Sequence, residues 1–225
     1  MTTHVATAPE APPAGSTPTT ALGLRRWFLV ASPVLAGVLA VVGAAADPAA
    51  GLEGKQLFQL YADNPGPLQI KSLALHWSYA FWIAPALLVA PYVRGRGAWI
   101  ATVAALLGFA GMTTLPGLLF IDWYDSAIGQ LYGADGTQAV ATLMEESMWG
   151  LQVFVLPGLL GFALGLPLAA VALWRAGRVR WWAPVAVVAG FLAFMSSNVM
   201  WWGCVLTTLA FTVFAVAVER GTRQV

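Results

Sequence analysis

The chain has 225 residues, of which 59% are hydrophobic and only 9% are charged, and its formal net charge is +1. This composition is too apolar for an average soluble domain, and the lack of a long basic cluster gives no basis for nucleic-acid binding. The single cysteine, Cys204, excludes an internal disulfide and any zinc motif built on paired cysteines.

Basic and acidic residues fall on opposite sides of the apolar segments. The positive-inside rule therefore places the arginine-bearing segments in the cytoplasm and the acidic segments outside. Both termini are predicted to be cytoplasmic. The Ala/Gly/Leu/Val-rich composition is typical of high-GC bacterial genomes, so we expect a multi-pass protein of a bacterial cytoplasmic membrane. The arginines are Arg25, Arg26, Arg94, Arg96, Arg175, Arg178, Arg180, Arg220 and Arg223, and the acids opposite them are Asp47, Glu53, Asp63, Asp122, Asp125, Asp135, Glu145 and Glu146.

Residues 1–22 are rich in Ala, Pro, Thr and Ser and are predicted to be a disordered cytoplasmic tail. An integral membrane domain follows over 23–220, and 221–225 form a second cytoplasmic tail. The first span covers about 27–46. Its flank, Arg25-Arg26, resembles a twin-arginine export signal, and Ala44-Ala45-Ala46 resembles a cleavage site. The alternative that we favour is an uncleaved first span, because the later spans follow the same arginine pattern.

Outer loop 47–70 contains a short amphipathic pattern, which predicts a helix lying on the membrane surface. Two spans follow at about 72–93 and 98–121, and Pro116-Gly117 is expected to bend the end of the second. The acidic outer loop 122–147 precedes a span at about 148–174. There, the spacing of Gly161 and Gly165 predicts close packing of another helix.

The last apolar segment, 181–218, is too long for one span, because a helix of that length measures about 57 Å against a bilayer core of ~30 Å. A break at Ser196-Ser197-Asn198 gives spans at 181–197 and 201–218. We therefore predict an all-α polytopic bundle of six transmembrane helices, with five as the alternative. Similarities between 77–114 and 149–197 leave two explanations open: a parallel repeat of helix hairpins 2–3 and 4–5, or chance in sequence of low diversity.

Ionisable residues are missing from the central part of every predicted span, which argues against a proton-coupled transporter. Polar groups concentrate instead at the outer ends, where they could line an outward-facing vestibule or be solvated individually. A carboxylate there could orient His76 as a general base, but no known catalytic motif accompanies it, and we assign no catalytic residue. The vestibule candidates are His76, Asp122, Tyr124, Asp125, Glu145, Glu146 and Gln152.

Sulfur-bearing residues also gather in the outer half of the predicted spans. Thioether, thiolate and imidazole groups together select Cu(I), so a copper site is one hypothesis and flexible core filling by methionine is the other. The candidate ligands are His76, Met144, Met148, Met195, Met200 and Cys204.

The sequence identifies a membrane protein embedded in lipid and leaves three functions open. The first is binding or transport of a small or lipophilic molecule through an outward vestibule, without proton coupling. The second is an accessory or assembly subunit that packs on another membrane protein or on itself. The third is a membrane enzyme or copper-handling protein with a site at the outer face. We rank them in this order and predict no other cofactor.

Overall fold

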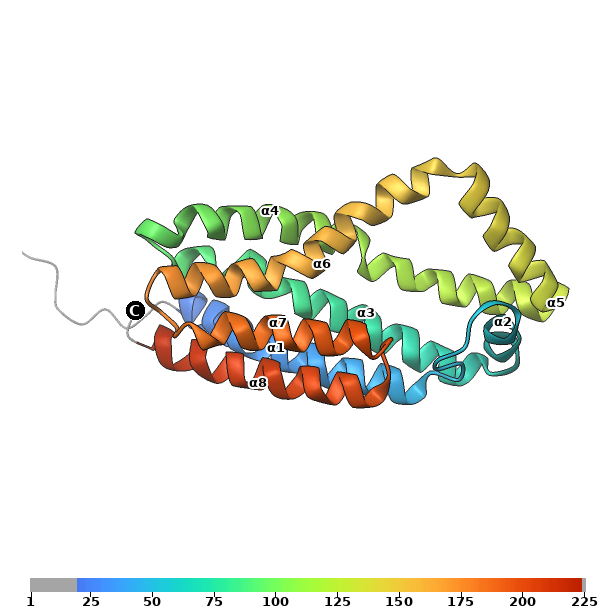
Figure 1. Cartoon of the computed structure of the whole chain (residues 1–225), viewed down its shortest axis with the longest axis horizontal. Helices are drawn as coiled ribbons and strands as arrows, with labels where there is room; N and C mark the ends of the chain where they lie inside the picture. The colour runs from blue at the N-terminus through green and yellow to red at the C-terminus, as the bar shows by residue number, and fades with distance from the viewer. Residues whose placement is uncertain (1–19, 224–225) are drawn as a thin grey trace, which may run out of the picture.

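The computed structural model describes residues 20–223, and every regular element among them is helical (Figure 1). The predicted all-α fold is confirmed. Short 3₁₀ turns at Ala90–Tyr92, Gly95–Gly97 and Pro116–Leu119 connect three of the helices. The α-helices are α1 (Thr20–Ala46), α2 (Gly54–Asp63), α3 (Pro65–Leu88), α4 (Ala98–Thr114), α5 (Phe120–Ser147), α6 (Trp149–Arg175), α7 (Trp182–Ser196) and α8 (Trp201–Thr222).

The tail predicted for 1–22 lies outside the described residues except at its last three, which already belong to α1. The predicted tail 221–225 is likewise described only to residue 223.

The turn between α7 and α8 falls at 197–200, where the sequence predicted a break. Asn198 and Val199 have φ angles of 49° and 60°, which reverse the chain tightly between the two helices.

Five helical runs are long and apolar enough to cross a membrane, and α7, with 15 residues, is apolar but shorter. The five runs are Ala21–Ala46, Pro65–Tyr92, Gly95–Ser147, Trp149–Arg175 and Trp201–Thr222. The third has 53 residues. It would be about 80 Å long if straight, more than twice the bilayer core. Its acids all lie in α5, so α4 is the part suited to the membrane. The protein is therefore a multi-pass membrane protein.

Helices α1, α3, α4, α7 and α8 and the second half of α6 run along one common axis (Figure 1). Helix α1 packs between α3 and α8, α7 packs on α8, and α4 packs on α6. The arginine-bearing segments meet at one end of this bundle, which we call the arginine end. Helices α2 and α5 lie at the opposite end, on the right in Figure 1, which we call the cap end. The chain thus separates its charges along the bundle axis.

Aromatic side chains fill the centre of the bundle. Trp82 of α3 is fully buried, and its ring centroid lies 4.4 Å from that of Phe162 and 4.5 Å from that of Phe211. Phe191 and Phe194 of α7 complete the cluster. Four helices therefore converge on one indole, and their packing closes the bundle axis at this level.

Glycines allow α4 and α6 to approach each other closely. A Cβ on Gly161 would collide with the backbone of Leu107 and would lie 2.5 Å from the Cα of Gly111. Gly165, one turn further along, faces Gly108 and Ala86. Small residues on both helices are what permits backbones to touch in a membrane.

The cap end differs from its description as two loops. Helix α3 begins at Pro65, seven residues before the predicted span, and most of 122–147 is the helix α5, which bends at Gly133 (φ 74°, ψ 172°). Helix α2 is the predicted amphipathic helix, but its apolar face packs on α5, with Ala62 against Gly129. Hairpins α3–α4 and α6–α7 are both present, and their origin by duplication stays a prediction.

Candidate functional site

A cluster of four polar side chains joins α2, α3 and α5 at the cap end. Lys71 Nζ donates hydrogen bonds to the hydroxyl of Tyr61 at 2.6 Å and to Oδ2 of Asp122 at 2.8 Å. The Ser72 hydroxyl donates to the same Asp122 oxygen at 2.7 Å. Lys71 also lies over the Tyr61 ring, 4.7 Å from its centroid. Each polar group in the cluster therefore has a partner, as burial requires.

Burial makes this cluster energetically important. Lys71 is 8% exposed, so its ammonium group is stabilised by Asp122 and Tyr61 rather than by water. Burial also raises the pKa of Tyr61 to about 12, against the opposing effect of Lys71, so the phenol stays protonated at neutral pH. The Ser126 hydroxyl donates to the Tyr61 carbonyl at 2.7 Å, which fixes α2 on α5. The cluster therefore holds the cap on the bundle.

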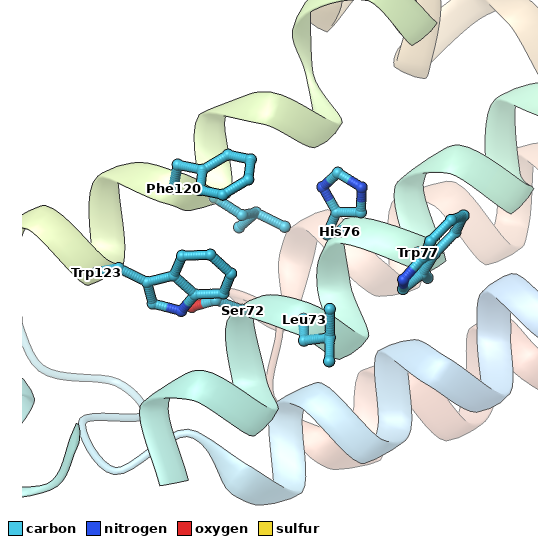
Figure 2. Close-up of a pocket in the computed structure, with 7 residues that line it drawn as sticks. Ser72, Leu73, His76, Trp77, Phe120 and Trp123 are labelled. Atoms are coloured by element: carbon cyan, nitrogen blue, oxygen red, sulfur yellow. The ribbon is translucent and has the colours of Figure 1, made fainter. Parts of the chain in front are cut away.

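A cavity of about 130 Å³ lies next to the cluster, between α3 and the start of α5. Figure 2 shows Phe120 and Trp123 facing His76 and Ser72 across it. Leu73, Trp77 and Phe120 stand at its rim, each about half exposed. The cavity is therefore mainly apolar and opens sideways, toward the surroundings of the bundle, rather than along its axis.

In this cavity wall beside α5, His76 has free hydrogen-bonding capacity, whereas the N–H of Trp123 is buried. His76 Nδ1 lies 2.9 Å from the carbonyl oxygen of Pro116, and because a carbonyl only accepts, Nδ1 donates and Nε2 is left for another partner. The indole N–H of Trp123 is buried and has no partner among the described residues. A ligand with a polar group at its end could bond the free Nε2 of His76.

The structure separates the seven vestibule candidates into two groups. Asp122 and His76 lie on the seam between α3 and α5, although Asp122 bonds Lys71 and Ser72 rather than orienting the imidazole. Asp125, half buried on α5, has its pKa raised to about 6 by burial and by the nearby carboxylate of Asp122. Tyr124 points outward, and Glu145, Glu146 and Gln152 are exposed around the α5–α6 junction, which projects from the bundle (Figure 1).

The candidate copper ligands lie on different parts of the fold. Met144 and Met148 belong to the projecting α5–α6 junction, whereas Met195, Met200 and Cys204 flank the α7–α8 turn, and His76 is on α3 (Figure 1). Cys204 is buried and its thiol faces the Val199 carbonyl at 3.7 Å. Among the described residues, no group of three or more His, Cys, Asp or Glu side chains could hold a metal ion. Copper binding stays an untested hypothesis.

Sequence reasoning missed Lys71, Ser72 and Tyr61. It placed Lys71 only on the outer side, between loop 47–70 and a span that was expected to begin at residue 72. A usable signal was present: Pro65 and Pro67 after Asn64 suit the first turn of a helix, which makes Lys71 part of α3. Its pairing with Asp122, 51 residues later, depends on how the helices pack.

Comparisons with protein-family models, with curated proteins and with solved structures found no match to this chain.

Proposed function

We propose that this protein binds the apolar part of an amphiphilic molecule in the cavity between α3 and α5. One observation carries the proposal: a mainly apolar cavity with a sideways opening, whose wall also includes the imidazole of His76. Apolar walls with a few polar groups are the usual makeup of small-molecule sites. The cavity is small, so it suits one segment of a chain rather than a whole lipid.

The cavity lies where an amphiphile in a membrane would reach it. Leu73 and Trp77 are half exposed and stand at the outer part of an apolar helix, and Trp side chains favour the headgroup layer. A lipid chain can therefore enter from the side without crossing water.

The packed bundle centre favours binding over transport. Trp82 and its four phenylalanine neighbours fill the axis, so a path through the bundle would require the aromatic cluster to separate. Binding at the side of the bundle requires no such movement. Binding of an apolar chain also requires no proton transfer.

Photocrosslinking tests this proposal. The full chain in lipid nanodiscs is exposed to a lysolipid with a diazirine in its acyl chain, and the crosslinked residues are mapped by mass spectrometry. We expect labelling to concentrate around Leu73, Trp77 and Phe120. Leu73→Phe, which narrows the cavity, should reduce this labelling at least fivefold. Leu106→Phe is the matched control, because Leu106 is 65% exposed on α4 and lies outside the cavity. Even labelling around the whole bundle would overturn the proposal.

We also propose the orientation of the protein. The arginine end faces the cytoplasm of a bacterial membrane and the cap end faces outward, because arginine-rich loops are retained on the cytoplasmic side. This orientation places the cavity near the outer headgroup layer.

A second function is favoured by the first half of α6. Among Trp149–Leu160, one residue, Gly158, is buried, and Val153 and Leu156 are 61% and 57% exposed. Such a helix half, with few neighbours in its own chain, is suited to an accessory subunit that packs on another membrane protein. Cysteine crosslinking at position 156 in native membranes tests this: a discrete heteromeric product supports it, and its absence together with a monomeric mass contradicts it.

A further inference from the structure

The proposed cavity continues into a second space along the same helix pair. A groove of about 310 Å³ lies between the start of α3 and α5, further out than the cavity. It is lined by Pro65, Leu68, Gln69, Trp123, Ser126, Ala127 and Gln130. Trp123 lines both spaces. On α3 the lining residues of the two spaces recur at helical spacing from 65 to 77 and so share one face, about 18 Å long.

Polarity changes along this seam. The cavity is walled by Leu73, Trp77 and Phe120, whereas the groove adds two glutamines and a serine. One N–H group of Gln69 bonds the Pro65 carbonyl at 3.2 Å, and one of Gln130 bonds the Ser126 hydroxyl at 3.1 Å. Each amide therefore keeps a carbonyl oxygen and a second N–H for a ligand.

Charge decides what kind of headgroup fits. The described residues that line the groove carry no charge. The nearest cation on α3, Lys71, is buried and bonded to Asp122 and Tyr61, so it cannot neutralise an anionic ligand. Asp125 on α5 adds negative charge. An anionic headgroup would thus lose solvation without gaining a partner, whereas hydroxyl groups, which both donate and accept, match the free amides.

We propose that the seam binds a lipid with an uncharged polyhydroxyl headgroup, such as a glycosyl diacylglycerol, with the sugar in the groove and one acyl segment in the cavity. This inference rests on the proposed function, because the acyl segment occupies the same cavity. The axis of the seam suits such a lipid: the polar groove lies outward of the apolar cavity along α3, as a headgroup lies outward of its chains.

The test measures lipid binding to the full chain in phosphatidylcholine nanodiscs by native mass spectrometry. The probes are glucosyl diacylglycerol and phosphatidylglycerol with identical acyl chains, and free glucose is added as competitor. We expect one glucosyl lipid per chain, bound at least tenfold more tightly than the anionic lipid. Free glucose should not compete at concentrations equal to those of the lipid.

Variants separate the headgroup from the acyl chain. Gln69→Met and Gln130→Met each keep the side-chain size and remove hydrogen-bonding groups. Each should weaken the glucosyl lipid about fivefold, the effect of about one net hydrogen bond, and leave phosphatidylglycerol unchanged. Gln138→Met is the matched control, because Gln138 is on α5 but outside the groove.

The outcomes distinguish this inference from the proposed function. If Leu73→Phe weakens both lipids but the two lipids bind equally, the cavity binds chains and the headgroup inference is wrong. If free glucose competes fully, the ligand is a soluble sugar and the lipid assignment is wrong. If neither the cavity variant nor the groove variants change binding, both proposals fail.

Discussion

Replacing Lys71 by methionine should release the cap from the bundle. The substitution keeps much of the aliphatic stem and removes the ammonium group, which leaves Asp122, whose side chain is 17% exposed, bonded to Ser72 alone. Breaking one side of a largely buried ion pair costs about 3 kcal/mol. For a chain of this size, that loss corresponds to a fall in melting temperature of roughly 6–12 °C.

The assay combines thermal unfolding in detergent with hydrogen exchange of the α2 backbone. We expect Lys71→Met to lower the melting temperature and to accelerate exchange in α2 more than in α1, because Tyr61 loses its bond to Lys71. Asp122→Asn should act similarly. The double variant should lose no more than either single variant, since no unpaired charge then remains buried.

The other lysine provides the control. Lys55 pairs with Asp135 at the surface, where its side chain is 65% exposed, and Lys55→Met should change stability by less than about 0.5 kcal/mol. If the losses of the two single variants simply add in the double variant, Lys71 and Asp122 do not stabilise the fold as a pair, and the reasoning about the cap is refuted.

Three further predictions concern packing, pH and orientation. Gly161→Leu should destabilise the bundle by about 3 kcal/mol in thermal unfolding, because α4 leaves no room, whereas Gly150→Leu on the same helix meets open space and should change little. Burial raises the pKa of Asp125 in the folded protein to about 6, from an ordinary value of 3.8, so its contribution to stability is present below pH 4 and lost as pH rises through 6. Asp125→Asn should therefore raise the free energy of unfolding at pH 7 by about 1 kcal/mol, allowing for the partial exposure of Asp125, and should leave it unchanged at pH 4. A reporter active only in the cytoplasm should work when fused after Arg178 and after Val225, and failure at both sites would reverse the proposed orientation.

Apolar runs and the residues between them were enough to predict most of the fold. Span lengths follow from the thickness of the bilayer core, which is why the helices could be predicted from the lengths of the apolar runs. The break before α8 could be predicted from Ser196-Ser197-Asn198. Polar segments are the exception to such reasoning, and here segment 122–147 was predicted as an outer loop although α5 is helical over most of its length. Periodicity is weak in α5, because it mixes acids, glycines and apolar residues without one clear apolar face.

The candidate site could be predicted only in part. The distribution of charges along the chain placed His76 and Asp122 at the same end of the bundle, because that placement depends only on which end of its span a residue occupies. Nothing local pairs Asp122 with Lys71, or brings Trp123 opposite Ser72, since these contacts depend on the rotation of α3 and α5 about their own axes. The sequence by itself determined a multi-pass helical bundle with its charges separated between two ends. Only the tertiary structure decided which polar groups are buried together and where a cavity remains, because both depend on side-chain packing between segments far apart in the chain.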